Sequence, residues 1–294
     1  MRWAAVEERL PPPCTEGTEL EDAIFDGCFY TAPQQHKRHG PVLMHISLSG
    51  AMAAGGSGHV DNVDFSFDGP FGTYDENQLQ RGLQIYTEIC SGCHGLKFLP
   101  IRTLGDDGGP HLPEDQVRAY ADYYEVFDAD LDDYRAATPN DNFPGSSLEN
   151  APDLTMMAKA RAGFHGPYGL GINQFIHGIG GADYIASLLQ GYTGEEKEEA
   201  GTVLYENTTY PGGWIAMAPP LYGEDLDYAD GHSNDLQHLS EDVAAFLMWT
   251  AEPKMMARKQ AGFVGVLFLT ILSVLLYLTN KRLWAPIKAR YKKT

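Results

Sequence analysis

The sequence predicts a mainly α-helical domain with long irregular loops, followed by one membrane-spanning helix. Near the start of the domain, apolar side chains recur at Leu79, Leu83 and Tyr86, a spacing that places them on one face of an amphipathic helix. A second apolar face runs through residues 243–250. Residues 260–280 then form an uncharged run rich in Leu, Val, Ile and Phe. At about 1.5 Å per residue this run is about 31 Å long, the thickness of the hydrocarbon core of a bilayer.

Capping residues predict where both helices of the domain begin. Asp75 is the expected N-cap of the first helix, and Gln78 lies at its capping-box position. Ser240 is the expected N-cap of the second helix, followed by two acidic residues. Gly82 is costly inside a helix, so we expect another helix to cross closely at this point. The helix after Ser240 is its natural partner. Two further helices are predicted, a short one at residues 114–126 and one that opens at Pro152 and runs to Arg161.

The first helix leads into the sequence Cys90-Ser91-Gly92-Cys93-His94, which has the C-x-x-C-H form of c-type haem attachment. Two thiols three residues apart can form thioethers with the two vinyl groups of one porphyrin. The histidine that follows can bind the iron. We therefore predict one covalently bound haem c, attached through Cys90 and Cys93, with His94 as an axial ligand.

Two other interpretations of this motif are a redox dithiol and part of a zinc site. A thioredoxin-like dithiol protein needs a βαβ pattern around the motif, and the sequence shows none. A zinc ribbon needs a second close pair of cysteines, whereas thirteen residues separate Cys14 from Cys28. Those two cysteines could form a disulfide in an oxidising compartment.

A haem that carries electrons usually has a second axial ligand, and a methionine in that position raises the reduction potential. Met217 lies among Pro and Gly residues in the loop 210–220, so it is presented by a turn rather than by a helix. It is the first candidate for the sixth ligand. The residues alone leave His165, His177 and Met156 as alternatives.

The chain is strongly acidic, with a formal net charge of −19. Residues 281–294 contain six basic residues and no acid, which leaves 15 basic against 40 acidic residues, a charge of −25, on the rest. Such a body argues against nucleic acid as a partner and suits a basic protein. Solubility alone is the simpler explanation of the acidity. The acidic stretches 128–133 and 195–199 are expected to be exposed.

The beginning of the chain resembles an export signal. Basic residues at 36–39, a short apolar run at 42–48 and small residues at 50–55 predict cleavage near Ala53. The alternatives are a retained extension and an upstream segment that is never translated.

The basic tail is expected to remain cytoplasmic, which places the acidic domain of this single-pass protein on the outer side of the membrane. The predicted organisation is a signal peptide or unplaced extension at 1–55, a haem domain at 56–252, a transmembrane anchor at 253–283 and a basic cytoplasmic tail at 284–294.

Several stretches in this order resemble the cytochrome c1 family, the haem subunit of the cytochrome bc1 complex, and especially its alphaproteobacterial form. The resemblance runs from about residue 64 to the end of the chain and leaves residues 1–55 unmatched. It is carried by residues 79–86 with the haem motif, 152–154, 159–164, 180–184, 214–220, 246–254 and 278–284.

The resemblance implies a class I cytochrome c-like core with large loop insertions and a C-terminal anchor. It implies Met217 as the second iron ligand, Arg161 near a haem propionate and Tyr184 on the same side of the haem. Two departures from the family are visible. The Gly-rich lead into Pro152 is replaced by residues 146–151, and no cysteine pair follows His94 to form the disulfide of some relatives.

The function implied is that of an electron-transfer subunit of quinol–cytochrome c oxidoreductase, with no bond chemistry of its own. The location implied is a bacterial inner membrane, with the haem domain on the periplasmic side. Its implied partners are cytochrome b, the Rieske iron–sulfur protein and a basic cytochrome c. The main alternative is a monohaem, membrane-anchored cytochrome of a terminal oxidase. A gas-binding haem sensor and a membrane-anchored dithiol protein are further alternatives.

Overall fold

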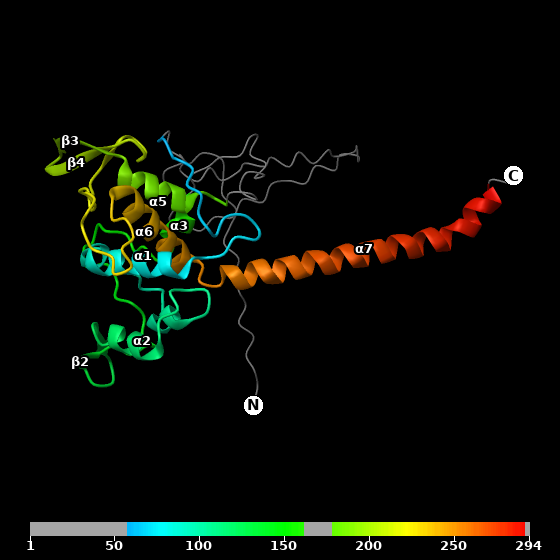
Figure 1. The fold of residues 1–294 in the computed structure, drawn as a ribbon, viewed down its shortest axis with the longest axis horizontal. Coiled ribbons are helices and arrows are strands. Elements are labelled where there is room, and N and C mark those ends of the chain that lie inside the picture. Colours follow the sequence, from blue (N-terminus) through cyan, green and yellow to red (C-terminus); the bar gives the residue numbers. More distant parts are fainter. Residues whose placement is uncertain (1–57, 162–177, 292–294) are drawn as a thin grey trace, which may run out of the picture. The chain divides into compact units, whose positions relative to one another are not determined.

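The computed structural model describes residues 58–161 and 178–291 of this chain. Helices form most of its regular structure, and those before the last one pack around a hydrophobic core (Figure 1). The predicted mainly α-helical fold with a long apolar C-terminal helix is confirmed. The α-helices are α1 (Glu76–Glu88), α2 (Glu114–Ala121), α3 (Met157–Ala160), α5 (Gly181–Gln190), α6 (Leu236–Ala251) and α7 (Met255–Tyr291).

Helix α1 begins where the sequence predicts. The Asp75 side chain accepts hydrogen bonds from the backbone N–H groups of Asn77 and Gln78, which satisfies donors that the helix itself leaves unpaired. The helix ends at Glu88, and a 3-10 turn over Cys90–Gly92 follows it. The haem motif therefore lies at the carboxyl end of α1.

Helices α1 and α6 cross at Gly82, as predicted. A Cβ atom at this position would lie 2.3 Å from the Asp242 carbonyl oxygen and 2.5 Å from the Phe246 Cβ. Beside the crossing, the Arg81 Nε donates to the Asp242 carboxylate at 2.7 Å. Only glycine lets the two backbones come this close, so the residue that weakens α1 as an isolated helix is required by the packing.

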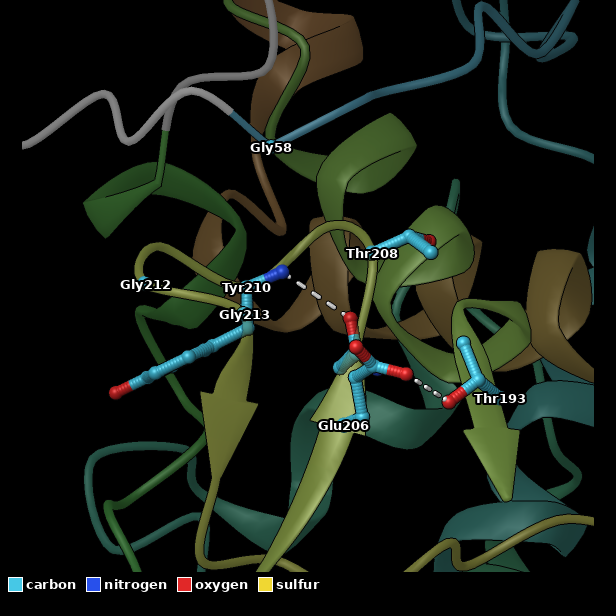
Figure 2. Close-up of a pocket in the computed structure, with 8 residues that line it drawn as sticks. Gly58, Thr193, Glu206, Thr208, Tyr210, Gly212 and Gly213 are labelled. Atoms are coloured by element: carbon cyan, nitrogen blue, oxygen red, sulfur yellow. Dashed lines mark hydrogen bonds between the residues drawn. The ribbon is translucent and has the colours of Figure 1, made fainter. Parts of the chain in front are cut away.

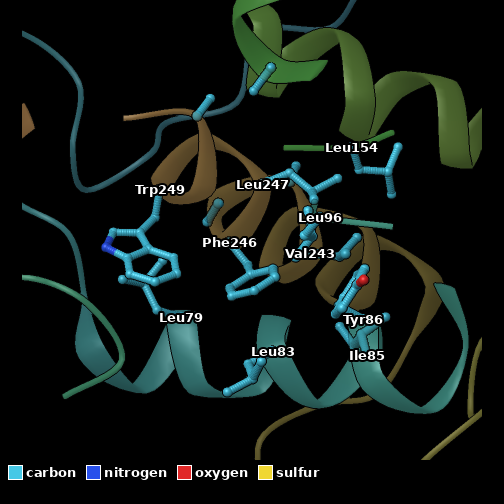
Figure 3. Packing of buried hydrophobic residues seen from close by; sticks show 14 of the residues in the cluster. Leu79, Leu83, Ile85, Tyr86, Leu96, Leu154, Val243, Phe246, Leu247 and Trp249 are labelled. Atoms are coloured by element: carbon cyan, nitrogen blue, oxygen red, sulfur yellow. The ribbon is translucent and has the colours of Figure 1, made fainter. Parts of the chain in front are cut away.

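The core between these helices is large and aromatic-rich. Figure 3 shows that the apolar faces of α1 and α6 meet, with side chains nearly or fully shielded from solvent. Burial of this area is the main stabilising contribution to the domain. The core residues drawn there include Leu79, Leu83, Tyr86, Val243, Phe246 and Trp249.

The predicted cap of α6 is wrong. The helix begins five residues earlier, and its N-cap is Asp235, whose carboxylate accepts from the His238 N–H at 2.9 Å. Ser240 lies inside the helix, where its hydroxyl donates to the Gln237 carbonyl and accepts from the Gln190 amide at 2.7 Å. Ser240 therefore joins α6 to α5 and does not cap α6.

Two small antiparallel sheets are additions that the sequence did not predict. Strands β1 (Glu125–Asp128) and β2 (Asp133–Ala136) form a hairpin, and α2 ends before it instead of running to residue 126 as predicted. Strands β3 (Tyr192–Glu199), β4 (Thr202–Asn207) and β5 (Trp214–Ile215) form the second sheet. Both acidic stretches lie in these hairpins and are mostly exposed, as expected.

Helix α7 contains the predicted membrane span. Within the described residues it is the one helix that is long and apolar enough to cross a bilayer, over Met255–Lys288. Met255 is buried against the domain, but from Phe263 onward nearly all its apolar side chains are exposed. Such a surface needs an apolar solvent, so this helix fits a single-pass membrane anchor.

Candidate haem site

The two motif cysteines lie in one tight turn. Backbone hydrogen bonds run from the Cys93 and His94 N–H groups to the Cys90 carbonyl, at 3.2 and 2.9 Å. Cys90 is half-buried against the core and Cys93 is exposed. The turn thus holds two thiols and an imidazole in the short segment that covalent attachment of a haem requires.

The environment of Cys90 does not favour the redox-dithiol interpretation. Burial raises the pKa of the Cys90 thiol to about 12, with a smaller contribution from Cys93. A reactive dithiol needs the opposite, a thiol whose pKa is lowered so that the thiolate forms near neutral pH. Among the residues that the structure describes, no group of three His, Cys, Asp or Glu side chains is placed to hold a zinc ion.

The imidazole of His94 is oriented by the backbone. Its Nδ1 lies 2.8 Å from the Pro152 carbonyl oxygen, so this nitrogen carries the proton and donates. The Nε2 is then the nitrogen available to a metal. The His94 carbonyl accepts from the hydroxyl of the fully buried Tyr86 at 3.1 Å. These residues therefore fit a haem iron bound at the His94 Nε2.

The segment whose carbonyl accepts the His94 hydrogen bond is itself hydrogen-bonded to the chain after the motif. The Asp153 carboxylate accepts from the Lys97 N–H at 2.9 Å and from the Thr155 N–H and hydroxyl at 3.0 and 2.6 Å. The Leu154 N–H donates to the Gly95 carbonyl at 2.9 Å. The predicted helix that opens at Pro152 is therefore wrong at its start, because Asp153 forms a turn and α3 begins only at Met157.

Met217 lies in the loop after β5, outside any helix, as predicted. The residue is half-buried, and its carbonyl accepts from the Tyr192 hydroxyl of β3 at 3.0 Å. The thioether, by contrast, has only weak hydrogen-bonding capacity, so the structure controls its position through the backbone. Nothing in the sequence marked Tyr192 for this task.

A buried asparagine organises the turn that leads to Met217. The Asn207 side chain is fully buried, accepts from the Thr209 and Tyr210 N–H groups at 3.0 and 3.1 Å, and donates to the Leu188 carbonyl at 2.8 Å. Figure 2 shows the turn beside a polar pocket, and a dashed line there marks the hydrogen bond that the Tyr210 N–H donates to the Asn207 side chain. Gly212 and Gly213 both have positive φ, 88° and 78°, which favours glycine.

Of the other candidates for the second axial ligand, the structure describes only Met156. His165 and His177 lie outside the described residues. Met156 precedes α3 and is 48% exposed. Met217 therefore remains the predicted second axial ligand. Hydrogen bonds fix the backbone of its loop at Met217 itself and at the preceding turn.

Arg161 and Tyr184, the two residues expected near a haem propionate, lie close to each other. Arg161 follows α3 and is exposed, whereas Tyr184 on α5 is 8% exposed. Burial raises the pKa of the Tyr184 hydroxyl more than the neighbouring Arg161 guanidinium lowers it, so the net shift is upward. A cation beside a buried phenol could bind a carboxylate through charge-assisted hydrogen bonds. Contact with a propionate remains a prediction for both.

The two-thiol turn, the oriented histidine and the apolar terminal helix are together typical of a membrane-anchored c-type cytochrome. Comparison with known proteins agrees. The pattern of the Cytochrome C1 family matches residues 65–287, and the chain belongs to this family. Members carry one covalently bound haem c, so the predicted cofactor is confirmed along with the family.

Three relatives illustrate the range of similarity. Cytochrome c1 of Cereibacter sphaeroides is 56% identical over 271 residues, which cover 84% of this chain and 95% of that protein. A protein of Bradyrhizobium diazoefficiens named cytochrome b/c1 is 39% identical, over 81% of this chain and 37% of that protein. The mitochondrial cytochrome c1 heme protein of Saccharomyces cerevisiae is 35% identical, over 82% of this chain and 77% of that protein.

Proposed function

We propose that this chain is the haem subunit of a cytochrome bc1 complex, a quinol–cytochrome c oxidoreductase, and that it relays single electrons. It would receive them from the Rieske iron–sulfur protein and pass them to a basic cytochrome c. The bound haem c supplies the one-electron redox chemistry. The polypeptide holds the haem, controls the surroundings of the iron and presents a docking surface.

One observation carries this proposal. The family match continues from residue 65 through the haem motif and the Met217 loop to residue 287 in the anchor, so all three belong to one pattern. A monohaem cytochrome of a terminal oxidase would share the motif and an anchor. It has no reason to share the stretches between them.

Each site residue has a distinct role in the proposal. Cys90 and Cys93 would form the thioethers, and His94 and Met217 would hold the iron. The Pro152 carbonyl keeps the proton on the His94 Nδ1 and holds the imidazole in one orientation. A ligand pair that is held in place rearranges little when the iron changes its charge, which favours fast electron transfer.

Charge and the anchor support the proposed partners and sidedness. Outside residues 281–294 the chain carries a charge of −25, which suits a basic electron acceptor. The name cytochrome b/c1 of the Bradyrhizobium diazoefficiens relative supports cytochrome b as the membrane partner. The basic end of α7 would lie in the cytoplasm and the haem domain in the periplasm.

The decisive experiment is purification of the chain from its native membrane and identification of the proteins that remain bound. The proposal requires cytochrome b and a Rieske protein in constant ratio to the haem c. Recovery with a copper–haem oxidase would overturn it. In the same preparation, electron transfer to a basic cytochrome c should slow as salt rises, whereas transfer to an uncharged acceptor should not.

A further inference from the structure

A cavity of about 740 Å³ lies where the haem domain meets the first turns of α7. Five segments line it: the loop at residues 67–71, Lys159 of α3, residues 178–183 at the start of α5, the end of α6, and α7 as far as Val266. We call it the anchor cavity. It is separate from the haem motif and from the Met217 loop, neither of which contributes a lining residue.

One end of the anchor cavity is polar. The Glu252 carboxylate forms ion pairs with Lys159 of α3 and Arg258 of α7, and its side chain is only 14% exposed. Burial raises the pKa of Glu252, but the hydrogen bonds from Arg258 and Lys159 lower it more, and the net shift is downward. Lys259 donates to the carbonyls of Phe67 and Gly72. A single glutamate thus bridges two cations at this end.

Arg258 retains donor capacity toward the cavity. Its side chain is 61% exposed, and its hydrogen bonds to Glu252 use its Nε and one terminal nitrogen. A guanidinium has five N–H donors in a planar fork, a geometry that matches a phosphate. Two further carboxylates line the cavity, Asp68 and Asp183, and each accepts from a backbone N–H.

The other end of the anchor cavity is apolar and lies along the membrane span. Phe71 and Phe263 are 76% and 56% exposed, and their rings meet edge to face with centroids 5.7 Å apart. Val266 is 66% exposed. It follows Arg258 by two helical turns, about 12 Å along the axis, inside the run of α7 that has no charge. With the uncharged run of α7 inserted in a bilayer, the cavity would lie across the boundary between headgroups and hydrocarbon.

We propose that the anchor cavity binds a glycerophospholipid of the surrounding membrane. Its phosphate would accept hydrogen bonds from Arg258, and an acyl chain would lie against Phe263 and Val266. A water-soluble anion could occupy the polar end but would leave the apolar end uncovered, whereas a phospholipid matches both. The inference depends on insertion of α7 in a membrane and not on the electron-transfer role.

Gly262 offers a test that leaves the charges unchanged. It lines the cavity, and a Cβ atom there would meet no atom within 4 Å, so the backbone has room for a side chain and Gly262→Leu adds bulk at the cavity wall. Gly265 on the same helix also has no atom within 4 Å and does not line the cavity. Gly265→Leu is therefore the matched control for helix propensity and added bulk.

The measurement is the number of phospholipids that stay on the haem-loaded protein, purified with its partners, after extensive detergent washing. Native mass spectrometry and phosphate analysis report it, and haem content with a thermal melt confirms folding. Wild type and Gly265→Leu should keep one lipid that Gly262→Leu loses. Equal retention in all three would overturn the proposal.

The polar end is tested with Arg258→Gln, with Lys254→Gln as control because Lys254 is exposed and does not line the cavity. Added back to washed protein, phosphatidylglycerol should bind at least tenfold more weakly to Arg258→Gln than to the control. Equal binding of glycerol phosphate and of the phospholipid would indicate a phosphate site rather than a lipid site. Loss of a partner subunit from Gly262→Leu, with lipid retained, would indicate a protein interface instead.

Discussion

The two candidate iron ligands are held in different ways. On the His94 side, the ring itself donates to a backbone carbonyl, and Asp153 fastens that carbonyl's segment to the chain after the motif. On the Met217 side, the hydrogen bonds between described residues reach the backbone alone, through Tyr192 at the residue and Asn207 at the preceding turn.

This difference follows from side-chain chemistry. An imidazole has a second nitrogen that can be held while the first binds a metal, but a thioether has no such group. The position of Met217 therefore depends on the fold of its loop. We expect substitutions that disturb the Met217 loop to open the sixth coordination position. Substitutions that remove hydrogen bonds on the His94 side should lower the free energy of unfolding and leave that position closed.

The largest effect on this comparison should come from Met217→Leu. The variant should keep its covalently attached haem, because Cys90, Cys93 and His94 are unchanged, but lose the second axial ligand. Carbon monoxide should then bind to nearly all of the reduced protein, as read from its optical spectrum. Met156→Leu is the matched control and should resemble wild type. An unchanged spectrum in Met217→Leu would remove this residue from the site.

Asn207→Ala should have the next largest effect. It removes three hydrogen bonds in a fully buried place: the Thr209 and Tyr210 N–H groups lose this acceptor, and the Leu188 carbonyl keeps the bond from the Gly191 N–H. The free energy of unfolding should fall by about 3 kcal/mol. Chemical denaturation measures it, with the exposed Asn150→Ala as control.

If the loop holds the ligand, Asn207→Ala should also bind carbon monoxide in part. Lost stability with a closed sixth position would mean that Met217 is held independently of its turn.

Asp153→Ala tests the other side and should be milder. Its carboxylate is only partly buried and Lys97 is exposed, so the freed Lys97 N–H can reach water, whereas the groups of the buried Thr155 lose this partner. Unfolding free energy should fall by about 1–2 kcal/mol without carbon monoxide binding. The exposed Glu149→Ala serves as control. An opened sixth position here would contradict the distinction between the two sides.

Tyr192→Phe should have the smallest effect. It removes one hydrogen bond to the Met217 carbonyl and keeps the ring. A loss of about 1 kcal/mol in unfolding free energy is expected. The control is Tyr222→Phe, since Tyr222 is 76% exposed. A loss above that of Asn207→Ala would show that Tyr192 is the main support of the loop.

Much of the fold could be predicted because it depends on local chemistry. The Asp75 cap acts on residues two and three positions away, and the anchor needs only a long apolar run. Gly82 was informative because glycine destabilises a helix interior, so its presence implied that another element packs closely there. That element is the backbone of α6.

The failures have equally specific causes. Ser240 was predicted as the cap because hydroxyls often cap helices. The helix instead begins five residues earlier, where the Asp235 carboxylate accepts from a backbone N–H. The Pro152–Asp153 pair looked like a helix start, but its polar groups bind residues of the distant haem-motif segment. The acidic hairpins had no alternating apolar pattern to reveal them, because they are mostly exposed on both faces.

By itself, the sequence determined the haem motif, the family, the anchor and the short list of second ligands, since each rests on residue type and spacing along the chain. Only the tertiary structure decided which carbonyl orients His94, which buried amide organises the Met217 turn and where a cavity forms beside α7. Those features arise between residues 19 to more than 190 positions apart in the sequence, and which groups meet there depends on burial and backbone geometry.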